Sequence, residues 1–204
     1  MSKILQLKMT SQRALLREAQ QNRKLVRLRH KKLEFGSFCG YVGGVGREFV
    51  LLWTINDALY YDGMYAMRHC DITELEVPDK RHAFVRKVLA IKKIEPKTPG
   101  NFPLDTIHEV IQGAGQRSPV ISVYINSEED SEGCYVGRFL GVEENGFTLQ
   151  GISTDAVWMS EPSCFTWDKV STVSMEEGYT QALLMVAGDP PPLTQSDTDM
   201  ELAY

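Results

Sequence analysis

The feature that most constrains the fold of this chain is a match of the sequence with itself. Residues 49–90 align without a gap to residues 147–188, at an offset of 98 residues. A match at a fixed offset predicts two copies of one structural unit. Two units of roughly 90 residues each are near the small end of the size range of domains. The matched pairs include Phe49 with Phe147, Leu51 with Leu149, Asp57 with Asp155, Ile72 with Val170, Thr73 with Ser171, Leu75 with Val173 and Val88 with Val186.

The first unit is predicted to run from a helix through five short strands to a second helix. Glycines around Val45-Gly46 favour a hairpin, because glycine adopts the positive φ that such turns need. A helix continuing to Lys32 is the alternative to the strand at residues 25–30. The predicted elements are a helix at residues 10–22, strands at 25–30, 35–44, 47–55, 64–69 and 72–77 with an irregularity at Thr73-Glu74, and a helix from Pro78-Asp79 to Ile91 with Phe84, Val85, Val88 and Leu89 on its apolar face.

The second unit is predicted to repeat this order after a linker at residues 93–103, which is rich in proline. The Asn145-Gly146 pair is a strong hairpin signal. The predicted elements are a helix capped by Asp105, strands at 120–125, 134–142, 147–152, 157–159, 164–167 and 170–175, and a helix at 177–186. We therefore predict a first domain at residues 10–92, a second at 104–187, and a disordered acidic tail at 188–204.

Five short, bent strands with a helix across one end predict a small closed barrel, since closure removes exposed sheet edges. The segments that carry this pattern are Gly-Tyr-Val at 40–42, Phe-Val-Leu-Leu at 49–52, Asp-Gly at 62–63 and Asp-Ile-x-x-Leu at 71–75. The chain resembles the Sm-like proteins of the SH3-like small-barrel class, and also uncharacterised bacterial proteins with such barrels. The resemblance implies a mainly β fold with flanking helices, built from two tandem five-stranded Sm-like barrels.

The resemblance also directs attention to the segment before the last strand of each unit. In RNA-binding Sm-like proteins, an Ile-Arg-Gly-type segment at this place helps to hold a base. The first unit has Arg68 there, followed by His69 where the glycine belongs, and the second unit has no arginine in residues 165–170.

Charge is distributed unevenly along the chain. Residues 1–33 contain ten lysines and arginines and one acidic residue, a net charge of +9, and the remainder has 12 basic and 26 acidic residues, a net charge of −14. Such a basic segment can bind phosphates, bind a protein partner, or fold onto its own acidic body. The candidate residues for binding nucleic acid or a partner are Arg23, Lys24, Arg27, Arg29, Lys31, Lys32 and Arg68.

Other chemical motifs favour structural roles. Adjacent strand residues point to opposite faces, so His69 and Cys70 are not expected to form a catalytic pair. The four cysteines and four histidines are scattered along the chain, so we expect no zinc site and no other metal or cofactor. The glycines at 40–46 lack the lysine and helix of a phosphate loop. Without an export signal or a membrane span, reduced cysteines indicate a cytoplasmic protein.

These patterns favour a non-catalytic binding or assembly module of unknown ligand. The first alternative is a regulatory protein that binds RNA or DNA through the basic segment. The second is an enzyme that pairs Asp57, Asp62 or Asp71 with His69 or His82. The expected partner is an unknown protein or a nucleic acid, without a membrane. Sm-like relatives form rings by pairing barrel edges, and a duplicated chain could instead pair its own two barrels, which would leave a monomer or a dimer formed through barrel edges.

Overall fold

The computed structural model describes residues 3–31, 33, 37–77, 80–96, 100–126 and 132–192. Within these residues the chain forms mainly antiparallel β-structure with four α-helices. The helices are α1 (Lys3–Gln21), α2 (Lys80–Ile91), α3 (Ile107–Arg117) and α4 (Gly178–Ala187). The strands are β1 (Leu25–His30), β2 (Phe38–Val45), β3 (Phe49–Ile55), β4 (Tyr61–Arg68), β5 (Ile72–Glu76), β6 (Ile121–Asn126), β7 (Glu132–Glu143), β8 (Gly146–Ile152), β9 (Trp158–Thr166) and β10 (Val170–Met175).

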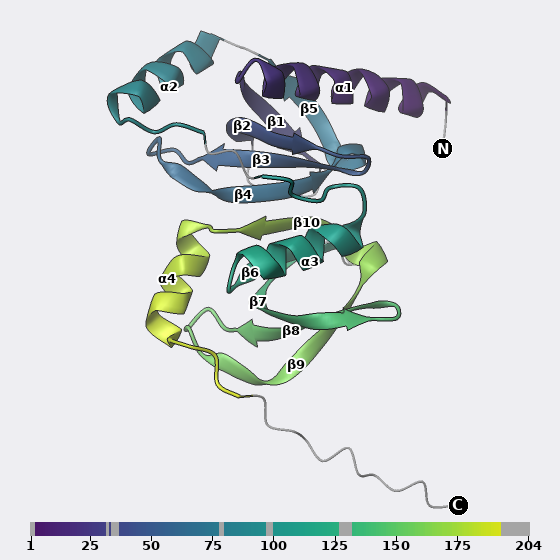
Figure 1. The fold of residues 1–204 in the computed structure, drawn as a ribbon, viewed down its shortest axis with the longest axis vertical. Helices are drawn as coiled ribbons and strands as arrows, with labels where there is room; N and C mark the ends of the chain where they lie inside the picture. Colours follow the sequence, from purple (N-terminus) through teal and green to yellow (C-terminus); the bar gives the residue numbers. More distant parts are fainter. Residues whose placement is uncertain are drawn as a thin grey trace, which may run out of the picture.

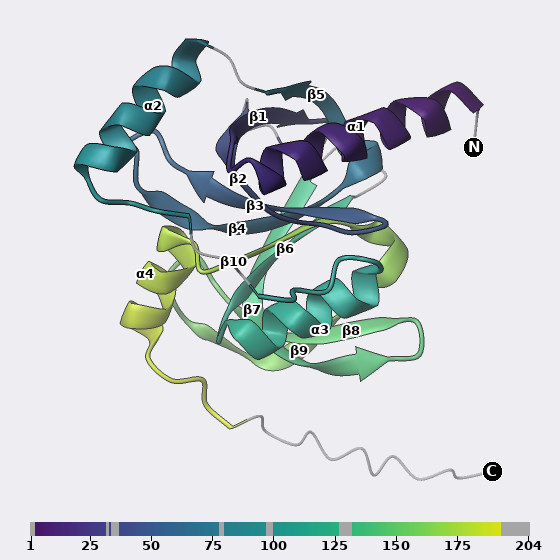
Figure 2. The same cartoon turned by 45° about the horizontal axis from the view of Figure 1, so that its top comes forward.

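All ten strands belong to one open sheet with the order β5-β1-β2-β3-β4-β10-β6-β7-β8-β9. Each half of this sheet has the same internal order, in which the last strand of the half lies beside its first strand. The halves meet where β4 pairs with β10 in an antiparallel register. Figure 1 shows this meeting in the middle of the molecule, and Figure 2 shows α1 across the first half and α3 across the second.

Irregular features also occur at matching places in the two halves. A short 3-10 helix precedes the last strand in each, η1 (His69–Asp71) and η2 (Trp167–Lys169). The last strands then carry a β-bulge, because Thr73 and Ser171 are skipped in the pairing with β1 and β6. The predicted irregularity at Thr73-Glu74 is therefore confirmed. A bulge increases the local twist, which bends the strand.

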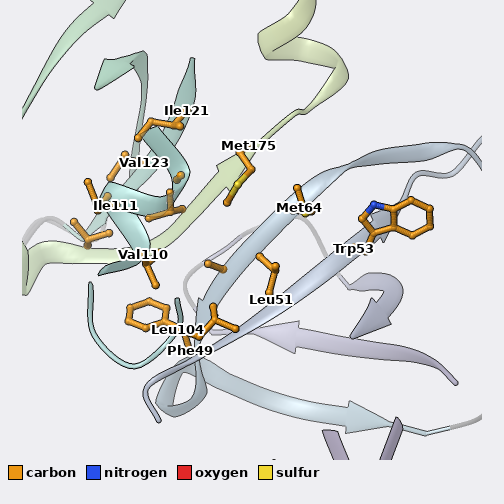
Figure 3. Packing of buried hydrophobic residues seen from close by; sticks show 14 of the residues in the cluster. Phe49, Leu51, Trp53, Met64, Leu104, Val110, Ile111, Ile121, Val123 and Met175 are labelled. Carbon is orange, nitrogen blue, oxygen red and sulfur yellow. The ribbon is translucent and has the colours of Figure 1, made fainter. Parts of the chain in front are cut away.

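The largest apolar cluster crosses the junction of the two halves. Phe49, Leu51 and Met64 from the first half share it with Val110 and Met175 from the second (Figure 3). A second cluster lies beneath α1 and includes residues of β1, β3 and β4. Because the first cluster contains residues of both halves, burial of apolar surface holds the two halves together. Strand β4 contributes residues to both clusters.

The prediction of mainly β structure with flanking helices is confirmed. The finer prediction of two closed five-stranded barrels is not, because β4 pairs with β10 and the hydrogen-bonded sheet remains open. No helix among the described residues combines the length and the apolar character that crossing a membrane requires.

Several local predictions need correction. The two strands expected at 157–159 and 164–167 are one continuous strand, β9. Helix α3 is capped by Thr106 rather than Asp105, in a capping box with Glu109. On α2, Phe84 is 63 % exposed, and His82, Val85 and Leu89 form the buried stripe. Pro78 and Asp79, expected to open α2, lie outside the described residues.

Candidate functional site

A pocket of about 380 Å³ lies where the two halves of the sheet meet, and we call it the junction pocket. It has three carboxylates, Asp57, Asp62 and Glu177, and its aromatic lining includes the tyrosines Tyr65, Tyr124 and Tyr179. No lysine, arginine or histidine in the described part of the chain lines it. The site is therefore a negatively charged cavity with aromatic walls.

The pairing of four strands brings the polar side chains of this pocket together. Tyr65 of β4 pairs with Ser174 of β10, which pairs in turn with Ser122 of β6. In the next strand, Cys134 of β7 pairs with Tyr124 of β6. Directly paired residues of antiparallel strands point to the same face of a sheet. This face therefore carries hydroxyl and thiol groups across the junction, whereas the opposite face carries the apolar cluster.

Glu177 is the central group of the pocket. Its side chain is carried on the residue that precedes α4, and the residue is only 6 % exposed. A buried carboxylate requires hydrogen-bond donors to replace water. Tyr65 donates to one carboxylate oxygen, and the Ser122 hydroxyl donates to the other at 2.6 Å. The positive end of the α4 dipole lies next to this carboxylate and also favours negative charge.

Asp62 is held at the rim by backbone contacts. Its Oδ1 atom accepts a hydrogen bond from the N–H of Gly178, the first residue of α4, at 3.1 Å. The Thr54 hydroxyl donates to the carbonyl of Asp62 at 2.7 Å. The next residue, Gly63, has a φ of 82°, in the region that favours glycine. Asp57, by contrast, is exposed in the turn after β3.

The surroundings of Glu177 keep its neighbours protonated. Burial raises the pKa of Tyr65 and of Tyr124 well above the usual range, and the negative charge of Glu177 raises both further. Cys134 as a residue is exposed, but partial desolvation of its thiol in the pocket wall raises the pKa to about 11, with Glu177 acting in the same direction. A thiol in this state is a poor nucleophile at neutral pH, since the thiolate is the reactive form. The pocket offers donors and fixed negative charge, which suit binding.

The described residues provide no group of three or more His, Cys, Asp or Glu side chains placed to hold a metal ion. The carboxylates of the junction pocket are thus arranged as separate charges along its wall. Such an arrangement can interact with a ligand that spreads its positive charge over a larger volume than a metal ion.

Most of the basic residues predicted to bind a partner form ion pairs within the chain. Lys24 lies 2.8 Å from Glu18, and Lys31 lies 2.8 Å from Asp71. On β1, Arg27 and Arg29 lie 3.7 Å and 3.3 Å from Glu76 and Glu74 of the neighbouring β5. Arg23 is exposed in the turn after α1, and Lys32 lies outside the described residues.

Arg68 is placed apart from this segment, at the end of β4. Its guanidinium donates to the carbonyl of Trp167 at 3.2 Å and lies 5.5 Å from the centre of the Phe49 ring. Trp167 belongs to η2, so Arg68 links the first half to the segment before the last strand of the second. The strand order places β2 and β3 between Arg68 and the basic residues of β1.

The His69-Cys70-Asp71 segment forms η1, so the prediction that His69 and Cys70 are adjacent strand residues is wrong. Cys70 and Asp71 interact through their side chains, whereas His69 has different neighbours. His69 is buried with Nε2 3.1 Å from the Gly46 carbonyl, and burial lowers its pKa to about 4. Asp71 pairs with Lys31, and Cys70 is exposed. No described histidine lines the junction pocket beside Asp57 and Asp62. Near Asp71, the structure places Nε2 of His30 at 3.9 Å, a histidine that the enzyme hypothesis did not name.

Sequence reasoning did not identify Tyr65, Ser122 or Glu177 as site residues. Each is unremarkable alone, and only the β4–β10 pairing brings them together. The available signal was the acidic pair Glu176-Glu177 directly before a helix without charged residues.

Comparisons of the chain with protein-family models, with curated proteins and with solved structures give no match. The interpretation of the junction pocket therefore starts from its own residues.

Proposed function

We propose that this chain is a non-catalytic binding module, built from two tandem Sm-like units, that receives a positively charged organic group in its junction pocket. The observation that carries this proposal is the composition of the pocket wall. Three carboxylates and three tyrosines line it, and no described basic side chain is part of the lining.

Electrostatics select the sign of the ligand. Three carboxylates in a concave site create a negative potential that concentrates cations. Aromatic rings add to this preference, because their faces attract ammonium and guanidinium groups. An anion would be repelled by the same groups. We therefore assign the ligand to the ammonium and guanidinium class.

The three acids have different tasks in this proposal. Both oxygens of Glu177 already accept hydrogen bonds, so it contributes charge from the pocket floor. Asp62 is oriented through one oxygen, which leaves its second oxygen to face a ligand. Asp57 is exposed, so its carboxylate can contact a ligand at the mouth of the pocket.

The matching strand order and bulges of the two halves support two tandem Sm-like units. The ion pairs of Lys24, Arg27, Arg29 and Lys31 support a structural role for the basic segment. The raised pKa of Cys134 supports a site that binds without covalent chemistry.

The test is a titration of the ¹⁵N-labelled chain with butylammonium and butylguanidinium, with butanesulfonate as the anionic control. We expect saturable shifts of the amides of Gly63, Ser122 and Tyr124 with the two cations only. Removing two charges by Asp57→Asn with Asp62→Asn should weaken binding about thirtyfold, since each partly solvated charge pair is worth about 1 kcal/mol and about 1.4 kcal/mol corresponds to a factor of ten. Asp155→Asn is the matched control, because Asp155 stands at the offset position of Asp57.

Shifts that do not saturate, or equal shifts with butanesulfonate, would remove the proposal. Asp155→Asn removes one charge where the double variant removes two. A loss of binding free energy with Asp155→Asn of about half that of the double variant would therefore show that net charge, rather than the pocket, is responsible.

A further inference from the structure

The junction inside this chain shows how one half accepts an added strand. Residues Met64–Met67 of β4 lie antiparallel to Thr172–Met175 of β10. Alternate residues of β4, Met64 and Ala66, enter the same apolar cluster as Val110 of α3. The edge strand thus supplies the backbone pairing, and the helix beside it supplies an apolar surface for every second side chain of the added strand.

Strand β5 has the same position in the first half that β10 has in the second. In the described chain it pairs with β1 on one side, and it forms one end of the sheet (Figure 2). No proline interrupts Ile72–Glu76. Thr73 and Glu74 are exposed, and no other described strand pairs with the outer edge of β5.

A hollow of about 300 Å³ lies between α1 and β5. Its wall includes Leu15 of α1, which is 44 % exposed, together with Ile72 and Leu75. The hollow lies beside β5 in the first half, at the place where α3 lies beside β10 in the second half. It has room for the apolar side chain of an added strand, in the way that the second half accommodates Met64.

The other edge of the sheet, β9, differs at the positions that β4 uses at the junction. Leu51 pairs with Ala66, and its offset partner Leu149 pairs with Ser163. By this register, Glu161 and Pro162 stand where β4 has Met64 and Tyr65. Proline lacks the backbone N–H that a neighbouring strand would use, and within sheets it belongs on edges. Glu161 would place a charge where the junction buries a methionine.

We infer that β5 is a docking edge for an extended strand from a different polypeptide, and that β9 of a second copy of this chain is not that strand. The partner strand carries apolar side chains at alternate positions, which face α1 and the hollow. Its other side chains are polar, because they lie beside Glu74 and Glu76 on the opposite face of β5. Main-chain pairing supplies affinity and the hollow supplies selectivity.

The first test uses the full chain and two fluorescent peptides, residues 61–68 and residues 158–166. We expect saturable anisotropy changes with the first peptide and none with the second. Leu15→Glu should weaken binding of the first peptide about tenfold, because it places a charge in the hollow. Ala14→Glu, on the exposed surface of α1 beside it, is the matched control and should bind as the unsubstituted chain does.

The second test introduces the β4 residues into β9 by Glu161→Met with Pro162→Tyr. Light scattering should give the mass of one 23.0 kDa chain for the unsubstituted protein and concentration-dependent assembly for the double variant. Adding Leu15→Glu should abolish this assembly. Three results would each overturn the inference: no peptide binding, peptide binding that Leu15→Glu leaves unchanged, or self-association of the unsubstituted protein that Leu15→Glu removes.

Discussion

Tyr65 donates its phenolic hydroxyl to the buried carboxylate of Glu177, although 112 residues separate them in the chain. The contact joins β4 of the first half to the residue that precedes α4 in the second. It lies at the floor of the junction pocket and beside the pairing of β4 with β10. The same hydrogen bond therefore contributes to the site and to the cohesion of the two halves.

Replacing Tyr65 by phenylalanine should test this contribution to stability. One oxygen of a buried carboxylate would lose its donor, so we expect the free energy of unfolding to fall by about 1–3 kcal/mol. Urea denaturation provides the measurement. Tyr135→Phe is the control, because Tyr135 is an exposed residue of β7 and should change stability by less than about 0.5 kcal/mol. Equal losses for both variants would contradict the assignment.

Gly63 should be intolerant of any side chain. Its φ is 82°, and a Cβ atom there would lie 2.6 Å from the Met175 carbonyl and 2.8 Å from the Glu177 nitrogen. Both atoms belong to the backbone of the second half, so the junction itself would have to move. We expect Gly63→Ala to cost about 2–4 kcal/mol in thermal unfolding, from backbone strain together with steric overlap. Gly141→Ala is the control, since a Cβ there meets nothing within 4 Å.

The buried histidine of η1 should make stability depend on pH. Burial lowers the pKa of His69 to about 4 in the folded chain from 6.5 in the unfolded chain. Between these values the unfolded chain binds the additional proton, so the free energy of unfolding should fall as pH decreases from 6.5 to 4. The loss at the end of this window is about 3 kcal/mol, at 1.36 kcal/mol per pKa unit.

Urea denaturation across this pH window, with His69→Gln for comparison, measures the effect. The variant should show a shallower dependence on pH than the unsubstituted chain. A dependence that is identical in His69→Gln and the unsubstituted chain would show that other groups are responsible.

The thiol of Cys134 should react slowly at neutral pH. With a pKa of about 11, only about one part in a thousand is thiolate at pH 8. In a variant that retains Cys134 and has serine at the other three cysteines, alkylation by iodoacetamide should accelerate about tenfold per pH unit up to pH 10. Urea-unfolded protein provides the control rate. A rate that levels off below pH 9 would contradict the environment described for this thiol.

The local elements of the fold could be predicted from the sequence. The glycine-containing turn before Phe49 and the Asn145-Gly146 pair define two hairpins, and the bulge at Thr73 was expected at that place. These features depend on turn conformation and side-chain alternation over a few residues. Both are properties of short segments, so they are readable without tertiary contacts.

The buried face of α2 could not be predicted from the sequence of the helix alone. Phe84 is more apolar than His82, yet Phe84 is exposed and His82 is buried. The rotation of a helix about its axis depends on the surface that receives it. That surface is assembled from strands remote in sequence, so the period of the helix alone did not determine which residues it buries.

The sequence by itself determined that this chain contains two similar successions of strands and helices. The reason is that hydrophobic periodicity, turn residues and the match at a fixed offset are properties of short segments. Only the tertiary structure decided that β4 meets β10 rather than closing a barrel, since every strand edge offers the same backbone groups and side-chain packing selects among them. That single pairing assembles Tyr65, Ser122 and Glu177 into one pocket. The alignment of β1 with β5 likewise pairs Arg27 and Arg29 with Glu76 and Glu74. The net charge of the basic segment alone did not determine whether its side chains pair within the chain or bind a partner.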